Sequence, residues 1–233
     1  PQLTAAPELW RDLDQLYPMW DVDGVDGIRD IVHNIVIPAS VVGSGGNIKK
    51  ELTGKGLSLL VDNGLDSKDG KFYILPSIRI SGSFTLWALA KVRVMSSDRA
   101  SDQDQALFNV NSENHAIYYN NNGNIQMFDG NGVVGSFTYE ADTWYSTVNL
   151  GETGKGTNSN TYKLYIDGVN VGSGSAFEDA NHLRLFEGKG FTTGGRTFDG
   201  FCLIVGIWNR HLTEAEIKQL YDDPFAMLRP AGF

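Results

Sequence analysis

Amide and aromatic side chains gather in the stretch YYNNNGNIQMFDGNG at 118–132, and they are the residues best suited to ligand chemistry. Aromatic rings offer flat faces to sugar C–H groups, while amides supply paired hydrogen-bond donors and acceptors. Asn and Asp are also the residues that tight turns select, so two ordinary hairpin tips are the alternative. The candidate glycan-binding residues are Tyr118, Tyr119, Asn121, Asn122, Asn124, Asp129 and Asn131.

Two acid-rich segments, DVDGVDG at 21–27 and VDNGLDSKDG at 61–70, carry oxygen ligands of the kind that calcium prefers. Neither segment follows the spacing of an EF-hand loop, and a solvated acidic turn is the alternative. Calcium is therefore the one cofactor that the sequence leaves open. The candidate calcium ligands are Asp21, Asp23, Asp26, Asp62, Asp66 and Asp69.

The histidines and the cysteine form no catalytic motif. The four histidines show no paired spacing, no HExxH helix and no neighbouring GxSxG nucleophile. The single cysteine, Cys202, lies in the apolar run FCLIVGIW, and we expect a buried, unreactive thiol there.

The elements that must position these residues are mainly β-strands. From Leu57 onward, apolar residues recur with a period of two in many short runs, among them SFTLWALAKVRV, TWYSTVNL and FCLIVGIW. Asn-Gly and Asp-Gly pairs at 122–123, 129–130 and 167–168 suit the turns that join antiparallel strands. The sequence predicts an all-β, antiparallel two-sheet sandwich, with 1–233 as a single domain.

A helix is also predicted near the N-terminus. The segment PELWRDLDQLY at 7–17 places Leu9, Leu13 and Leu16 at helical spacing. Residues 1–19 are therefore expected to form an N-terminal helical arm.

A second, short helix is predicted near the C-terminus. Thr213 and Glu216 have the spacing of a capping box, and Leu212 and Ile217 have that of a hydrophobic staple. The helical pattern ends at the DDP of 222–224. This amphipathic helix must lie against an apolar surface.

The last strand run, FCLIVGIW at 201–208, is apolar on both faces, so both faces should be covered. One cover is the sandwich core. The other is the closing helix, the N-terminal helix or another subunit. The residues expected at an interface with another subunit are Trp10, Leu13, Phe201, Leu203 and Val205.

Four segments in order carry a resemblance: LTGKGLSLLVDNGLDS, ISGSFTLWALAKV, YKLYIDGVNVGSGS and FDGFCLIVGIWNRHLTEAEIKQLY. Together they resemble the laminin-G-like, concanavalin A-like jelly rolls of bacterial and phage proteins, which implies a jelly-roll sandwich. The chain departs from the family in having no acid at 203–205. The ending LYDDPFAMLRP resembles the tails of such domains in tailed-phage virion proteins. The residues that match the closing family motif are Gly200, Trp208, Asn209, Arg210, Leu212, Thr213, Glu216, Ile217 and Tyr221.

The resemblance also raises the question of an enzyme. Related glucanases carry a Glu-x-Asp-x-x-Glu strand, because retaining glycoside hydrolysis needs two carboxyl groups about 5 Å apart. The nearest string here is EADTWY at Glu140–Tyr145, which lacks the second glutamate. We therefore expect a loop that leads into a strand, and no enzyme.

Charge and hydropathy exclude two classes of partner. Acidic residues outnumber basic ones 28 to 19, and no basic cluster is longer than Lys49-Lys50, so nucleic acid is not expected. No run approaches the roughly 18 consecutive apolar residues of a membrane span, and no signal peptide is visible. The expected localisation is a virion or extracellular surface after folding in the cytoplasm.

Three functions follow, in order of preference. The first is a non-catalytic structural and binding module on a phage virion surface, as a head decoration or fibre. Its expected partners are other virion or surface proteins, further copies of itself and a glycan. The alternative is a stand-alone carbohydrate-binding lectin module, and a glycoside hydrolase or lyase comes third.

Overall fold

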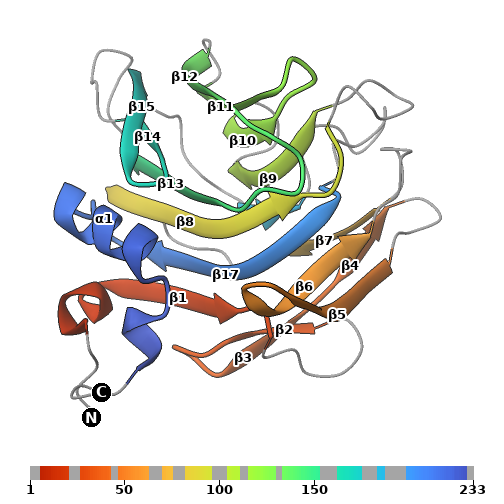
Figure 1. The fold of residues 1–233 in the computed structure, drawn as a ribbon. Coiled ribbons are helices and arrows are strands. Elements are labelled where there is room, and N and C mark those ends of the chain that lie inside the picture. The colour runs from red at the N-terminus through yellow and green to blue at the C-terminus, as the bar shows by residue number, and fades with distance from the viewer. Residues whose placement is uncertain are drawn as a thin grey trace.

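Most of the chain folds into strands that stack in two layers (Figure 1). The structure is a computed structural model, and it describes residues 6–20, 27–42, 47–62, 70–75, 82–95, 104–110, 115–129, 133–152, 162–174, 183–186 and 198–229.

The larger layer is an eight-stranded sheet in the order β15-β14-β13-β8-β17-β6-β5, with β1 pairing with β17 beside β6. Its strands are β1 (Leu13–Pro18), β5 (Asn47–Thr53), β6 (Gly56–Asp62), β8 (Ser83–Val92), β13 (Tyr145–Glu152), β14 (Tyr162–Ile166), β15 (Val169–Gly174) and β17 (Gly200–Trp208).

The second layer is a seven-stranded sheet in the order β12-β11-β10-β9-β16-β7-β4. Its strands are β4 (Ser40–Val42), β7 (Gly70–Ile74), β9 (Gln105–Val110), β10 (His115–Tyr119), β11 (Asn124–Asp129), β12 (Val133–Thr138) and β16 (Leu183–Leu185). A small third sheet pairs β2 (Gly27–Asp30) with β3 (Ile35–Pro38). Neighbouring strands pair antiparallel, which confirms the predicted jelly-roll sandwich.

Two hydrophobic cores lie on opposite sides of the eight-stranded sheet. Along β8, Leu86 and Ala88 belong to the main core between the two large sheets. Trp87 and Leu89, at the alternating positions, belong to a second core on the outer face. The outer face is therefore apolar as well, and it requires a cover.

The cover of the outer face comes from both ends of the chain. It consists of the 3-10 turn η1 (Pro7–Trp10), the helix α1 (Glu214–Asp222) and the 3-10 turn η3 (Ala226–Leu228). Two indole nitrogens connect these segments: Trp208 Nε1 donates to the Leu9 carbonyl at 2.7 Å, and Trp10 Nε1 donates to the Met227 carbonyl at 2.9 Å. The prediction that both faces of the last strand are covered is confirmed.

The predicted N-terminal helix is wrong beyond Trp10. Helical geometry stops at η1, and Asp12 adopts a left-handed backbone with φ of 55°, which a helix cannot contain. The following residues form β1, which pairs with β17 from Leu13 opposite Trp208 to Pro18 opposite Ile204. Strand pairing and burial on both sides outweigh the helical spacing of three leucines.

Helix α1 is confirmed, and its first turn has the predicted cap. Thr213 and Glu216 form both hydrogen bonds of the capping box. Glu216 also forms two parallel hydrogen bonds with Arg210, at 2.7 and 2.9 Å. Burial raises the pKa of Glu216, but the hydrogen bonds from Arg210 and Thr213 outweigh burial and lower that pKa to about 2. Arg210 also donates to the carbonyl of Glu8 at 2.9 Å, which ties α1 to η1.

The residues expected at a subunit interface lie mostly inside the chain. Leu203 and Val205 are 1% and 0% exposed, and Phe201 and Leu13 are 8% and 9% exposed. The chain's own termini and sheets cover these four side chains, so they offer no open surface to another subunit. Trp10 is 36% exposed, and its contact with a partner stays a prediction.

Among the described residues, no helix is long and apolar enough to cross a membrane.

Candidate functional site

The asparagines predicted to bind glycans lie at the tip of the β10–β11 hairpin, where their backbone groups and the Asn124 side chain hydrogen-bond largely within the hairpin. Asn120 Oδ1 accepts from the backbone N–H groups of Asn122 and Asn124, at 3.0 and 2.9 Å. Asn124 Nδ2 donates to the Asn122 carbonyl at 3.2 Å, and the Asn121 N–H donates to Asp104 Oδ1 at 3.2 Å. These are the hydrogen bonds of an ordinary hairpin tip.

The two tyrosines of the predicted glycan site are buried. Tyr119 is fully buried, and its ring lies 5.0 Å from that of Tyr139 in an edge-on arrangement. Tyr118 is 6% exposed. Neither ring presents an open face on which a sugar could stack. Asn131 and the side chain of Asp129 lie outside the described residues.

Of the predicted calcium ligands, Asp62 alone lies among the described residues, where it pairs with Arg93. Asp62 Oδ1 accepts from Arg93 Nη2 at 2.5 Å. Within the described ranges, no group of three or more His, Cys, Asp or Glu side chains could hold a metal ion. The ligands that lie outside the described residues are Asp21, Asp23, Asp26, Asp66 and Asp69.

Arg93, immediately after β8, joins two aspartates. Its Nη2 donates to Asp62 Oδ1 and to Asp199 Oδ1, at 2.5 and 2.6 Å, and its Nε donates to the same Asp199 oxygen at 2.9 Å. The side chain of Asp199 is only 2% exposed. Partial burial lowers the pKa of Arg93, but the two aspartates raise it above its ordinary value, so the guanidinium stays charged.

Lys91 lies two residues before Arg93, beside two aromatic rings. Its Nζ is 5.6 Å from the ring centroid of Trp144 and 4.9 Å from that of Phe201, and it forms an ion pair with Asp142. The Lys91 side chain is 13% exposed, whereas that of Asp142 is 73% exposed. The cation–π contacts hold both rings next to the charged groups.

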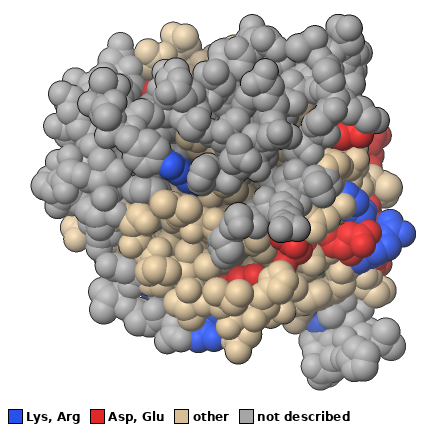
Figure 2. All heavy atoms as spheres, turned by 180° about the vertical axis from the view of Figure 1, so that it is seen from behind, with Lys and Arg blue, Asp and Glu red and all other residues tan. Residues whose placement is uncertain are grey.

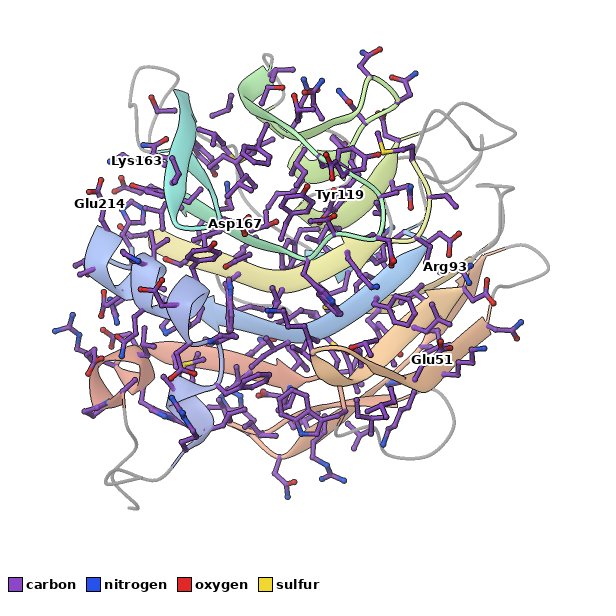
Figure 3. The ribbon with its side chains drawn as sticks, in the orientation of Figure 1. Glu51, Arg93, Tyr119, Lys163, Asp167 and Glu214 are labelled. Carbon is purple, nitrogen blue, oxygen red and sulfur yellow. The ribbon has the colours of Figure 1, made fainter. Side chains whose placement is uncertain are left out.

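The strand register brings these groups to one end of the eight-stranded sheet. Gly200 in β17 pairs with Val92 in β8 and with Val61 in β6. The Asp142 N–H donates to the Val92 carbonyl at 2.8 Å, so the turn before β13 lies at the same end. Figure 3 shows Arg93 at this end, across the molecule from α1. We define the rim cluster as Asp62, Lys91, Arg93, Asp142, Trp144, Asp199 and Phe201.

The rim cluster retains polar atoms that could bind a ligand. Arg93 Nη1, Asp62 Oδ2 and Asp142 Oδ2 have no hydrogen-bond partner in the part of the chain that the structure describes. The side chains of Arg93 and Asp62 are 32% and 31% exposed, and Trp144 is partly exposed next to Lys91. The cluster thus combines donors, acceptors and an aromatic surface, which is the chemistry of sugar recognition.

Sequence reasoning did not assign this site, although two signals point to it. In the run SFTLWALAKVRV, the face that carries Trp87 and Leu89 becomes charged at Lys91 and Arg93. The string EADTWY, considered only as an incomplete glucanase motif, contains Asp142 and Trp144 at the same end of the sheet.

The fold and the closing motif define the class of this chain. Residues 67–218 match the model of the concanavalin A-like lectin/glucanases superfamily, and the chain belongs to this family. The laminin-G-like resemblance is therefore confirmed. The family description names both lectins and glucanases, so membership alone does not distinguish a binding protein from an enzyme. No curated protein matches the chain by sequence.

Solved structures share the fold at low sequence identity. The Trypanosoma rangeli sialidase in complex with sialic acid is 17% identical with a TM-score of 0.63, and the match covers 91% of this chain and 33% of that one. Domain 4 of AbnA, a GH43 extracellular arabinanase from Geobacillus stearothermophilus, in complex with arabinotriose, is 18% identical with a TM-score of 0.59, covering 90% and 98%. The binding domain of botulinum neurotoxin DC in complex with SialylT is 9% identical with a TM-score of 0.62, covering 91% and 51%. The chain thus spans about a third of the sialidase chains it matches, and at these identities the likeness shows the fold alone.

The expected main function, a phage virion component, is contradicted by these matches. The matched structures are sialidases, an arabinanase domain and a toxin binding domain. They agree better with the lectin alternative. The closing strand, which supported an assembly role, is covered by the chain itself.

Proposed function

We propose that the chain is a non-catalytic, lectin-like module that binds glycans through the rim cluster. The observation that carries the proposal is Lys91 Nζ lying beside the rings of Trp144 and Phe201, at the sheet end where Arg93 forms its ion pairs. Family membership supports the proposal, as does the glycan chemistry in the names of the matched proteins.

In this proposal, Trp144 provides the stacking surface and the charged groups set the orientation of the sugar. Trp144 packs against the second core and is partly exposed, and in this proposal its exposed part contacts sugar C–H groups. Lys91 holds that ring through its cation–π contact and is itself held by Asp142. Arg93 Nη1 then donates a hydrogen bond to a hydroxyl group at the edge of the sugar, and Asp62 Oδ2 accepts one from a hydroxyl group.

The string nearest to a glucanase motif supports binding rather than hydrolysis. Glu140 and Asp142 lie in the turn before β13, where the Glu140 N–H donates to Tyr145 Oη at 3.0 Å. Tyr145 stands where the motif requires its second glutamate, and its ring is buried in the main core. This string therefore does not bring two carboxylates to one face of a strand, as retaining hydrolysis requires.

The test is a glycan-array screen of the chain, followed by calorimetric titration with the best ligand. Trp144→Ala should weaken binding by roughly tenfold, because an aromatic contact contributes about 0.5–1.5 kcal/mol beyond the apolar area that it buries. Tyr221→Ala is the matched control, since Tyr221 is a 45% exposed aromatic residue on α1, outside the rim cluster. Thermal unfolding of both variants checks that each is folded.

Three results would contradict the proposal. Absence of binding to every arrayed glycan removes the lectin function. Equal affinities for the wild type and a folded Trp144→Ala variant place the site elsewhere. Release of reducing ends from a polysaccharide makes the chain an enzyme.

A further inference from the structure

We infer that the rim cluster selects neutral, polyhydroxylated glycans and discriminates against glycans that carry a carboxylate or sulfate. This inference rests on the proposed function and adds the chemical class of the ligand. It follows from the charge of the cluster and from the kind of polar atom that the cluster leaves available.

The charge of the rim cluster disfavours an anion. Its three aspartates outnumber Lys91 and Arg93, so the formal charge of the cluster is −1. Both cations are already paired, Lys91 with Asp142 and Arg93 with Asp62 and Asp199. The chain as a whole carries a net charge of −9. The face in Figure 2 shows acidic and basic side chains scattered among neutral ones, without a continuous basic surface among the described residues.

The available atoms favour a ligand that donates as well as accepts. Two of them, Asp62 Oδ2 and Asp142 Oδ2, are carboxylate oxygens, which at neutral pH only accept hydrogen bonds. A sugar hydroxyl can donate to either oxygen and accept from Arg93 Nη1. A carboxylate or sulfate only accepts, so it could use Arg93 but would leave the aspartates facing a second anion.

A pair of neighbouring hydroxyls matches this combination of acceptor and donor atoms. One hydroxyl can donate to an aspartate oxygen while the next accepts from the Arg93 guanidinium. Hydrogen bonds to charged groups are stronger than neutral ones, so each such contact contributes to selectivity. The Trp144 ring, next to Lys91, supplies a neutral stacking surface, which adds affinity without a requirement for ligand charge.

The experiment is a glycan array of matched pairs, in which each neutral oligosaccharide is printed beside its sialylated, uronic or sulfated counterpart. We expect at least roughly tenfold weaker binding to the charged member, because its anion is repelled by the partly exposed aspartates of the rim cluster. Raising the salt concentration should narrow this difference, because salt screens the repulsion.

A variant separates this charge effect from general damage to the site. Asp142→Asn removes one of the three carboxylates from the cluster, so the ratio of neutral to acidic binding should fall several-fold. Asp222→Asn on α1 is the matched control, because it removes the same charge outside the cluster and should leave the ratio unchanged.

The outcomes distinguish the inference from the proposed function. Preference for the neutral members, reduced in Asp142→Asn, supports the inference. Equal or tighter binding to acidic members overturns the inference but leaves the lectin function in place. Absence of binding to every member overturns the proposed function, and the inference falls with it.

Discussion

At the scale of single residues, two arginines hold the sequence-distant parts of the chain together. Arg93 connects β6, β8 and the residue before β17 through Asp62 and Asp199. Arg210 connects α1 to the N-terminal turn through Glu216 and backbone carbonyls. In both cases one guanidinium neutralises a carboxylate that is largely removed from water, so removing the arginine takes the opposite charge away from a buried carboxylate.

We predict that Arg93→Ala lowers the free energy of unfolding by about 2–3 kcal/mol, because the Asp199 side chain, 2% exposed, loses its ion pair with the Arg93 guanidinium. The measurement is urea unfolding followed by tryptophan fluorescence. Lys218→Ala is the control, since its pair with Asp222 is exposed and should contribute about 0.5 kcal/mol or less. If the free energy of unfolding falls by a similar amount in both variants, Arg93 does not stabilise the fold through a buried ion pair.

Glu216 should make stability depend on pH in the acidic range. Its pKa is lowered from 4.5 to about 2 in the folded chain. A lowered carboxyl pKa contributes stability that is complete above the unfolded value and is lost as the pH falls towards the folded value. Glu216→Gln should therefore lower the free energy of unfolding by on the order of 3 kcal/mol above about pH 5.5. The difference from wild type should shrink as the pH falls towards about 2. A difference that stays constant across this range would contradict the role of ionised Glu216.

At the scale of elements, the sequence predicts best what is locally determined. The cap of α1 was predictable because Thr213 and Glu216 are three residues apart and hydrogen-bond to each other. The N-terminal helix was not, since its leucine spacing does not reveal the left-handed Asp12 or the pairing of β1 with β17. The rim cluster was not predictable either, because its members come from four separate segments that only the strand register brings together.

The strand identity of β1 can be tested at Leu16, which is fully buried in the second core. Leu16→Ala should lower the free energy of unfolding by about 2–5 kcal/mol, as expected for a leucine truncated in a core. Leu52→Ala is the control: Leu52 is 79% exposed, so its truncation should change stability by less than about 0.5 kcal/mol. An exposed N-terminal helical arm would instead give a negligible effect at Leu16.

The close approach of β12 and β15 gives a second prediction at this scale. A Cβ on Gly172 would meet the Val134 carbonyl and the Gly135 backbone, which cannot move aside as a side chain can. Gly172→Ala should therefore destabilise the chain by about 2–3 kcal/mol through overpacking. Gly54→Ala, where no atom lies within 4 Å, should change stability little. Equal melting temperatures for the two variants would contradict this close contact.

At the scale of the whole molecule, the apolar outer face of the sandwich is covered, and one edge strand, β5, is charged. The termini close the outer face of the eight-stranded sheet over β8 and β17. At one edge of that sheet, β5 carries Lys49 and Glu51, whose side chains are 57% and 46% exposed. Figure 3 labels Glu51 on this strand. Charged residues on an edge strand discourage pairing with another chain. These features favour a chain that folds without a partner. The structure does not test the homo-oligomer expected from the sequence, and the two alternatives differ in solution mass.

We therefore predict that light scattering gives the mass of one chain, 25.6 kDa, over a wide range of concentrations. Replacing Lys49 and Glu51 together by valine should produce a mass that rises with concentration, because the edge of β5 becomes apolar and free to pair. The matched control replaces Lys218 and Asp222 by valine, which removes the same two charges from α1 rather than from a strand edge. A wild-type mass of two or more chains would show that another surface drives assembly. Association of both double variants to the same extent would assign the effect to added hydrophobic surface and not to the strand edge.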